Sequence, residues 1–342
     1  MSMKFIKRIQ TPEEIIAQLP VPSQVKTIKA SRDNEIKRVF EGKDERFLLI
    51  IGPCSADNED SVCEYILKLA AVQEKVKDSI LIIPRIYTNK PRTTGEGYKG
   101  MVHQPDPAKD PDIFEGIKAI RKMHIRALCE SHLPAADEML YPENYTYLAD
   151  VLGYIAVGAR SVENQFHRLT ASGIDKPVGM KNPTSGDFSV MLNSITAAQN
   201  NHTFLYNGWE IQTSGNPLAH AILRGAVDSS GRNIPNYHYE DLIEVAKEYE
   251  KKGLINPAII VDTNHANSMK RFYEQPRITR EALLSRKYDA LLRKMIKGLM
   301  IESYLVEGNQ GIGENTYGKS ITDACLGWDS TEQLIYYVAE NL

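Results

Sequence analysis

The chain has 342 residues, of which 44 are acidic and 41 are Lys or Arg, so its formal net charge is −3. Apolar residues make up 42% and charged residues 25%, values close to the average for soluble globular proteins. These values exclude a disordered chain, a collagen-like repeat and a histone-like nucleic-acid binder. The length suits two ordinary domains or one barrel of roughly 250 residues with additions.

The sequence contains no segment that predicts a membrane span or a secretory signal. The longest apolar run, Phe47–Ile51, is far shorter than the ~18–20 residues that cross a bilayer. The first residues, MSMKFIKRIQTPEE, are basic but have no apolar region behind them. The cysteines, Cys54, Cys63, Cys129 and Cys325, do not predict a disulfide framework in a chain this long. We therefore expect a cytoplasmic protein with reduced thiols and no membrane contact.

Residues 1–45 precede the first predicted strand and form an N-terminal extension. Within it, Ser31–Glu41 predicts a short helix that places Ile36, Val39 and Phe40 on one side. An extension of this kind packs under the base of the following domain or against a neighbouring subunit. The sequence leaves both open.

From residue 46 to residue 342, short apolar runs alternate with longer segments of helical periodicity, as is typical of α/β proteins. The predicted strands are Phe47–Ile51, Ile80–Pro84, Arg126–Cys129, Tyr154–Val157, Pro177–Met180, Thr203–Leu205, Ala258–Val261 and Gly298–Ile301. The predicted helices are Glu59–Val76, Ile113–Met123, Ser161–Ala171, Ser189–Ala198, Tyr239–Lys252, Arg280–Lys294 and Ser330–Glu340. This alternation, without a Pro- or Ser-rich linker, predicts one (β/α)₈ TIM barrel.

Polar residues follow the predicted strands at their C-terminal ends, where barrels of this class carry their active sites. Cys54 follows the first strand, His265 the seventh and Glu302 the eighth, and these strands are neighbours in a closed barrel. Asp323 lies in the loop after the eighth strand. A thiolate, an imidazole and two carboxylates on one arc predict a divalent-metal site with an open position for substrate. The alternative is that Cys54 is a small buried apolar residue and His265 a hydrogen-bonded core histidine.

Cationic residues follow the remaining strands, and Glu130 and Glu138 follow the third. The cations are Arg85, Lys90, Arg92, Arg160, Lys181 and Arg224. Because like charges at one mouth repel each other, this arc predicts bound anions. Arg and Lys suit phosphate and carboxylate groups, and their number indicates more than one such group, for example two phosphates and a carboxylate. The cations stand singly among Gly, Pro and Thr in a slightly acidic chain, so we do not expect nucleic acid as a partner.

Motifs along the whole chain carry a family resemblance. They are GPCS (52–55), KPRTTGEGYKG (90–100), GARS (158–161), HRLTASG (167–173), PVGMKN (177–182), TSGN (213–216), ILRG (222–225), HANS (265–268), ESYLVEGNQ (302–310) and YGKSITDACLGW (317–328). In this order they resemble type I 3-deoxy-D-arabino-heptulosonate 7-phosphate (DAHP) synthase, the enzyme that opens the shikimate pathway.

The resemblance implies a metal-dependent (β/α)₈ barrel that condenses phosphoenolpyruvate with erythrose 4-phosphate and releases phosphate. By motif position, the implied metal ligands are Cys54, His265, Glu302 and Asp323, with Mn²⁺, Fe²⁺, Co²⁺ or Zn²⁺ as the ion. The implied phosphoenolpyruvate contacts are Arg85, Lys90, Glu138, Gly158, Ala159, Arg160, Lys181 and Arg224. Arg92 and Thr93 would hold the phosphate of erythrose 4-phosphate, and Lys90 or His265 would carry the proton.

The motifs do not decide how the protein is regulated or how it assembles. The stretch Tyr206–Thr213 is shorter than the hairpin of feedback-inhibited members, and Tyr98 stands where relatives carry Trp. Inhibition by an aromatic amino acid therefore stays open, and by resemblance we expect a homodimer or homotetramer.

Three other functions compete with the condensation. An octulosonate 8-phosphate synthase using arabinose 5-phosphate is disfavoured because the loop reads KPRTT rather than KANRSS. A non-catalytic barrel that binds phosphoenolpyruvate or an aromatic amino acid would have lost a metal ligand, and the four positions are intact. A metal-dependent phosphohydrolase fits the site residues but not the motif order.

Overall fold

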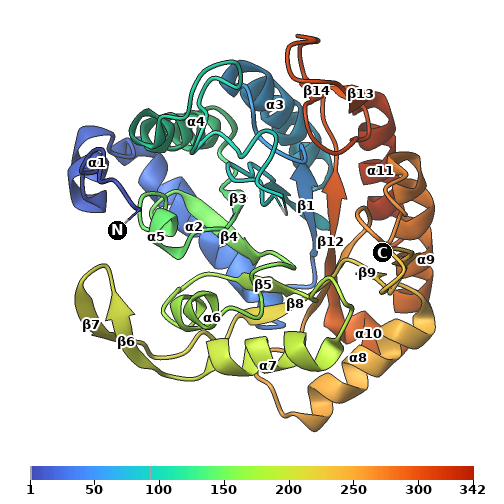
Figure 1. Ribbon diagram of the computed structural model, residues 1–342. Coiled ribbons are helices and arrows are strands. Elements are labelled where there is room, and N and C mark those ends of the chain that lie inside the picture. The colour runs from blue at the N-terminus through green and yellow to red at the C-terminus, as the bar shows by residue number, and fades with distance from the viewer. Residues whose placement is uncertain (1, 93) are drawn as a thin grey trace.

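A ring of eight parallel strands surrounded by helices forms the body of the computed structural model, which describes residues 2–92 and 94–342 (Figure 1). The order around the ring is β2-β1-β12-β11-β8-β5-β4-β3. Their bounds are β1 Phe47–Gly52, β2 Ile80–Pro84, β3 Ala135–Glu138, β4 Leu152–Val157, β5 Val178–Lys181, β8 Ala219–Leu223, β11 Ile259–Asp262 and β12 Ile296–Glu302. Between β2 and β3 the ring continues through a single bridge, in which the Ile86 amide donates to the Ala136 carbonyl at 2.9 Å. The predicted (β/α)₈ fold is confirmed.

Helices cover the outside of the ring, and three small sheets lie apart from it. The helices are α1 Pro12–Gln18, α2 Ser23–Phe40, α3 Glu59–Val76, α4 Ile113–Ser131, α5 Pro142–Tyr145, α6 Gln165–Ala171, α7 Phe188–Gln199, α8 Tyr239–Lys251, η1 Phe272–Glu274, α9 Gln275–Tyr288, α10 Ala290–Met295 and α11 Trp328–Glu340. The small sheets pair β6 Thr203–Tyr206 with β7 Trp209–Gln212, β9 Ala226–Val227 with β10 Asn233–Ile234, and β13 Val306–Asn309 with β14 Lys319–Ser320. No helix among the described residues is long and apolar enough to span a bilayer.

Alternate strand residues divide the core into two clusters, because successive side chains of a strand point to opposite faces. Leu49 and Ile51 of β1 belong to the large cluster that includes the helices α3, α4, α8 and α9. Leu48 and Ile50 belong to a smaller cluster, which fills the barrel interior. The strands that contribute side chains to it are β1, β2, β3, β4, β8, β11 and β12. Side chains of α2, including Phe40, belong to this inner cluster, so α2 closes one end of the barrel. The predicted helix Ser31–Glu41 is the second half of α2.

The predicted third strand, Arg126–Cys129, is wrong. These residues are the C-terminal part of α4, where Arg126 Nε donates to Glu130 Oε1 at 2.9 Å across one helical turn. The helix ends at His132 in the left-handed conformation, with φ 59°, and the third strand is β3. A run as short as Arg-Ala-Leu-Cys has no periodicity of its own, so it suits a strand as well as a helix. Glu130 therefore lies on a helix and not at a strand end.

The predicted strand Thr203–Leu205 is confirmed as a strand, but its place as the sixth strand of the barrel is wrong. These residues form β6, which pairs with β7 as an antiparallel hairpin that projects from the barrel (Figure 1). Its side chains are partly or fully exposed, whereas those of the true sixth strand, β8, are all buried. Arg224 consequently follows β8 directly, at the same strand end as the other predicted site residues.

Candidate active site

Three predicted metal ligands meet at the C-terminal ends of two adjacent strands. Gly52 at the end of β1 pairs with Glu302 at the end of β12, and Cys54 follows two residues after Gly52. Asp323 enters from the loop after β14. Sγ of Cys54 and one carboxylate oxygen each of Glu302 and Asp323 all lie within 4.8 Å of one another. The barrel register therefore assembles donors that are 269 positions apart in the chain.

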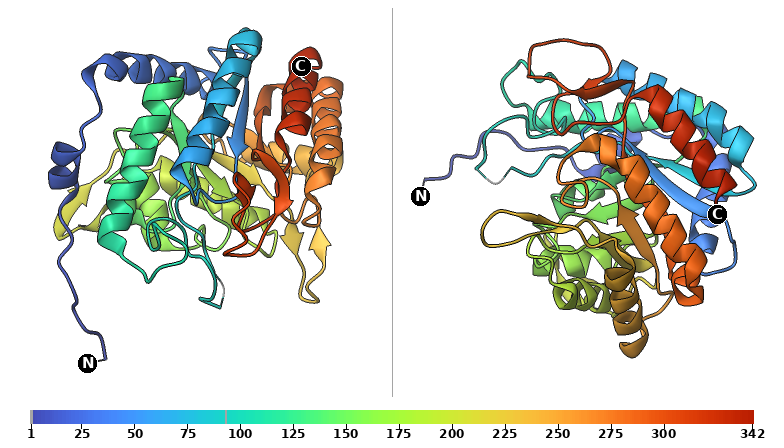
Figure 2. Two further views of the ribbon diagram at one scale, coloured as in Figure 1. Left: turned by 90° about the horizontal axis from the view of Figure 1, so that it is seen from above. Right: turned by 90° about the vertical axis from the view of Figure 1, so that its right-hand side faces the viewer.

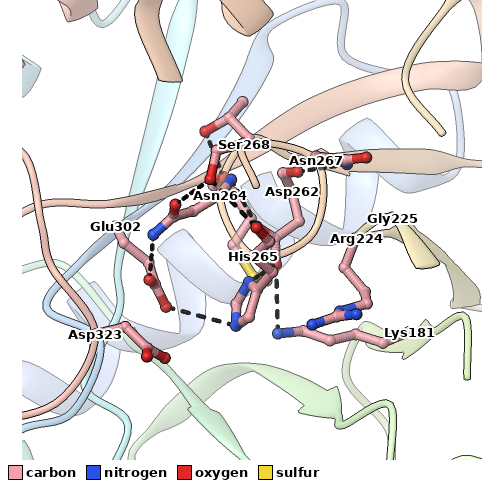
Figure 3. A network of polar contacts seen from close by, with 12 residues as sticks. Lys181, Arg224, Gly225, Asp262, Asn264, His265, Asn267, Ser268, Glu302 and Asp323 are labelled. Carbon is pink, nitrogen blue, oxygen red and sulfur yellow. Dashed lines mark hydrogen bonds and ion pairs between the residues drawn. The ribbon is translucent and has the colours of Figure 1, made fainter. Parts of the chain in front are cut away.

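His265 stands beside this cluster (Figure 3). Its Nε2 lies 3.7 Å from Oε1 of Glu302, and its Nδ1 lies 2.9 Å from Oδ2 of Asp262. Its backbone is left-handed, with φ 53°, which directs the ring back over the strand end. Asn264 donates to the other oxygen of Glu302 at 2.5 Å, so both carboxylate oxygens have partners. The structure thus brings His265 next to the other three predicted ligands.

The Lys90 ammonium lies between the sulfur and a carboxylate of the cluster. Nζ is 2.7 Å from Cys54 Sγ and 2.9 Å from Asp323 Oδ2. Burial of the Cys54 thiol, together with the Glu302 charge, raises its pKa to about 11. Burial also raises the pKa of Asp323, but the Lys90 charge outweighs this and holds that pKa below its usual value. Cys54 and Asp323 thus already contact one cation, the Lys90 ammonium. Together with His265 and Glu302 they offer sulfur, nitrogen and oxygen donors, a mixed set that suits a borderline divalent transition metal.

Arg85 contributes two unpartnered donors to the site. Its Nη2 donates to Glu302 Oε1 at 2.7 Å, and its guanidinium lies 3.9 Å from the centroid of the Tyr87 ring. Its Nε and Nη1 are buried and, among the described residues, have no hydrogen-bond partner. Nη1 of Arg224 is in the same state. Because a buried donor without an acceptor costs about 1–3 kcal/mol, these groups are arranged to receive an anion.

Asp262 joins the cationic arc to the metal cluster. It ends β11, is fully buried, and its Oδ2 contacts Nζ of Lys181 at 3.4 Å as well as His265 (Figure 3). Burial opposes ionisation of Asp262, but His265 and Lys181 hold its pKa well below the usual range. Burial lowers the pKa of Arg224, and the nearby Arg160 lowers it further.

A single cavity of about 150 Å³ unites the predicted substrate residues. Its lining includes Cys54, Arg85, Lys90, Arg92, Glu138, Gly158, Ala159, Arg160, Lys181, Arg224, His265 and Asp323. Glu302 lies against a second cavity that shares His265 and Asp323 with the first. Thr93 lies outside the described residues. The predicted substrate residues that the structure describes therefore share one cavity.

Gly158 lies in the cavity wall so close to Glu138 that a larger residue would not fit there. A Cβ on Gly158 would lie 2.3 Å from Oε1 of Glu138, closer than real contacts allow. Arg92, which also lines the cavity, is held by a hydrogen bond of 2.8 Å from its Nε to the Tyr98 carbonyl. Both contacts fix side chains that line the cavity.

Sequence reasoning assigned no role to Tyr87 or Asp262. Tyr87 provides a ring under Arg85 and lies 5.8 Å from Nζ of Lys181. The signal for Asp262 was present, because an acidic residue ends the apolar run IIVD and precedes His265 by three positions. Tyr87 gave no such signal, since an aromatic residue after a strand is ordinarily core.

The comparisons with known proteins agree with this geometry. The model of the DAHP synthetase I family matches residues 22–335. The chain belongs to that family. The Phe-sensitive phospho-2-dehydro-3-deoxyheptonate aldolase of Escherichia coli K12 is 38% identical over 346 residues, covering 98% of this chain and 95% of that one. The phenylalanine-inhibited enzyme of Saccharomyces cerevisiae is 35% identical over 350 residues, covering 97% and 91%.

A solved member of the DAHP synthetase I family shares the whole architecture. The phospho-2-dehydro-3-deoxyheptonate aldolase of Francisella tularensis SCHU S4 superposes with a TM-score of 0.92 at 32% identity, covering 99% of this chain and 98% of that one. The N-terminal helix α2 and the hairpin β6–β7 lie within the matched length.

Proposed function

We propose that this member of the DAHP synthetase I family condenses phosphoenolpyruvate with D-erythrose 4-phosphate and water, giving DAHP and inorganic phosphate, the first step of aromatic amino acid biosynthesis. The observation that carries the proposal is one cavity in which unpartnered guanidinium donors of Arg85 and Arg224 face a Cys54/Glu302/Asp323 donor cluster. Anion donors suit the two phosphorylated substrates, and the donor cluster suits a divalent metal.

The metal, held by Cys54, His265, Glu302 and Asp323, would supply Lewis-acid polarisation of the aldehyde oxygen. The remaining chemistry belongs to the chain. Arg85, Arg160, Lys181 and Arg224 bind the phosphate and carboxylate of phosphoenolpyruvate, and Arg92 with Thr93 binds the phosphate of the sugar. Fixing both substrates in this way supplies much of the acceleration through positioning.

Lys90 is our candidate for the proton donor. Carbon C3 of phosphoenolpyruvate bonds to the aldehyde carbon, and the aldehyde oxygen takes a proton from Nζ of Lys90. Burial favours the neutral amine, but the contacts of Nζ with Cys54 Sγ and with the Asp323 carboxylate outweigh it and raise the pKa of Lys90 above its usual value, so Nζ carries its proton. Water then adds at C2, and phosphate leaves with cleavage of the C–O bond.

The test follows loss of the enolpyruvate ultraviolet absorbance after mixing the protein with both substrates. We expect consumption that stops on chelation, returns with Mn²⁺ or Fe²⁺, and is lost in Cys54→Ala. Cys129→Ala is the matched control, because this thiol is half-buried on α4 and lies outside the cavity. No consumption after metal is restored, or equal consumption with arabinose 5-phosphate, would overturn the proposal.

We also propose that the protein assembles with copies of itself as a dimer or tetramer. Residues 2–10 leave the barrel as an extended arm (Figure 2). On this arm Phe5 is 92% exposed and Ile6 is 91% exposed. Exposed apolar side chains on an extended arm gain most from burial against a second copy of the chain.

An aromatic amino acid is the proposed effector, because curated relatives are named Phe-sensitive and Tyr-sensitive. The short β6–β7 hairpin reaches the barrel through Tyr206, whose hydroxyl donates to the Pro142 carbonyl at 2.9 Å. Adding Phe, Tyr or Trp to the absorbance assay tests this directly. A rate unchanged by all three would contradict it.

A further inference from the structure

A second collection of cations lies at the opposite end of the barrel from the catalytic cavity. A depression of about 1160 Å³ opens there. Its lining includes Phe47 and Ile296, which begin β1 and β12, and Ser79, which precedes β2. Because active-site residues follow strand ends, a depression at strand starts belongs to the other face. The chain's C-terminus lies at this end (Figure 2).

Seven Lys and Arg residues line the depression, of which Arg46 pairs with Asp44 and Lys77 with Glu74. We call the other five the basal cation cluster: Arg286, Lys287, Arg293, Lys294 and Lys297. The first two lie in the last turn of α9, the next two in the last turn of α10. Helix dipoles favour cations at such ends, which explains four of them individually. Lys297 lies in β12, directly after the C-cap Ile296 of α10.

No carboxylate neutralises this cluster at contact distance. Within residues 2–92 and 94–342, none of its five members forms an ion pair within 4.0 Å. On the facing wall, Asp44 is already held by Arg46, with Nη2 to Oδ2 at 2.7 Å. Glu41, Glu45, Asp78 and the C-terminal residue Leu342 also line the depression, and Glu41 pairs with Lys37 and Lys43 rather than with the cluster. The positive charges are therefore only partly balanced.

Two members of the cluster are half-buried, and their pKa values show the imbalance. Burial lowers the pKa of Arg286, and Arg293 lowers it further. Burial likewise lowers the pKa of Lys297, followed by the charges of Arg286 and Lys294, with Glu45 too weak to reverse this. The same pair of causes, burial and a neighbouring cation, acts on Arg224 in the catalytic cavity.

We propose that the basal depression binds a small molecule carrying two or more phosphate groups. The five cluster cations come from the ends of α9 and α10 and from β12 and, in the part of the chain that the structure describes, have no carboxylate within 4.0 Å, and guanidinium forks suit phosphate oxygens. The Arg286 guanidinium lies 5.3 Å from the centroid of the Phe47 ring and donates from Nε to the Ile296 carbonyl at 3.3 Å, which holds its fork in place. The chain as a whole is acidic, so the attraction is local to this depression.

Calorimetric titration with inorganic pyrophosphate tests the proposal on the metal-loaded protein, with phosphoenolpyruvate present to occupy the catalytic cavity. The test variant is Arg286→Gln/Lys297→Gln. The matched control is Lys26→Gln/Lys122→Gln, which removes the same charge from exposed positions on α2 and α4. Metal chelation by pyrophosphate is equal in both. We expect binding at least ten-fold weaker in the test variant alone, with synthase activity unchanged.

Thermal melting gives an independent readout. The readout is the change in melting temperature that pyrophosphate causes in each protein. With pyrophosphate, only the unmodified protein and the control are expected to gain melting temperature. Equal pyrophosphate binding by both variants, or an equal gain in melting temperature by both, would overturn the proposal.

Discussion

Asp262 contacts both His265, beside the predicted metal ligands, and Lys181, one of the cations of the catalytic cavity. One carboxylate oxygen balances both His265 and Lys181, and the side chain is fully buried. Removing one partner of a buried ionic group costs about 3–5 kcal/mol, since the other charges stay buried without compensation. The residue therefore determines both the placement of His265 and the local stability.

Asp262→Asn is expected to lower kcat by about 100-fold and to reduce the free energy of unfolding by about 3 kcal/mol. Steady-state kinetics and urea unfolding measure the two effects. Asp110→Asn, an exposed carboxylate, is the control and leaves both unchanged. A variant that keeps the kcat of the unmodified protein would show that Asp262 does not position His265.

Gly158 has a steric rather than an electrostatic role. Gly158→Ala would push a methyl group into Oε1 of Glu138, which costs about 1–3 kcal/mol in a packed wall. We expect the KM for phosphoenolpyruvate to rise about ten-fold. Gly311→Ala is the matched control, because its Cβ would lie 2.9 Å from Oε1 of Glu314, an exposed side chain that can move away. Equal KM values in both variants would contradict this.

At the scale of elements, α2 and the barrel interior meet at His220 of β8. Tyr154 donates to His220 Nε2 at 2.7 Å, and His220 Nδ1 donates to the Leu218 carbonyl at 2.9 Å. The Leu218 carbonyl can only accept a hydrogen bond, so Nδ1 carries the proton. Nε2 is therefore the acceptor of the Tyr154 hydroxyl. The Phe40 ring of α2 lies 4.3 Å from the imidazole, centroid to centroid. Burial lowers the pKa of His220 to about 4, so the ring is neutral at pH 7.

This neutral imidazole predicts a pH dependence of stability. Its folded-state pKa lies below the ordinary value of 6.5, so the unfolded chain binds more protons between these two values. Stability is therefore fully present above pH 6.5 and falls by about 3 kcal/mol as the pH drops to 4. Urea unfolding across this window in the unmodified protein and in His220→Gln measures it. An equal slope in both would contradict the assignment to His220.

Six of the predicted strands overlap barrel strands, because buried parallel strands are continuous apolar runs such as Phe47–Ile51. The errors at Arg126–Cys129 and Thr203–Leu205 share a cause. Both are short runs with no periodicity of their own, and the flanking structure decides their place: Arg126–Cys129 continues helix α4, and Thr203–Leu205 pairs with the neighbouring strand β7 instead of a barrel strand. The same limit applies to the site. Motifs identified Cys54, but the contacts of Tyr87 depend on long-range packing that no local pattern records.

The whole molecule separates its charges between two ends. In a chain of net charge −3, cations gather around the catalytic cavity at one end and in the basal cation cluster at the other. Closed parallel barrels make this possible, because every strand presents a loop at each end. The filled barrel interior therefore separates the catalytic cavity from the basal depression.

The extended N-terminal arm provides the whole-molecule prediction for assembly. Deleting residues 2–6 removes Phe5 and Ile6 but leaves the hydrogen bond from Tyr147 to the Gln10 carbonyl, 2.7 Å, and helix α1. We expect light scattering to show a smaller molar mass than for the full chain, with the melting temperature of the barrel preserved. An unchanged molar mass would show that the arm is not part of a contact between copies.

The central claim is the condensation itself, and ³¹P NMR of a single reaction mixture tests it most directly. The metal-loaded protein is mixed with phosphoenolpyruvate and erythrose 4-phosphate, and the phosphorus signals are followed in time. We predict that the phosphoenolpyruvate signal is replaced by that of inorganic phosphate while the erythrose 4-phosphate signal is replaced, in equal amount, by that of a new sugar phosphate at the position of authentic DAHP. Inorganic phosphate appearing without the new sugar phosphate would indicate a phosphohydrolase and would contradict the account.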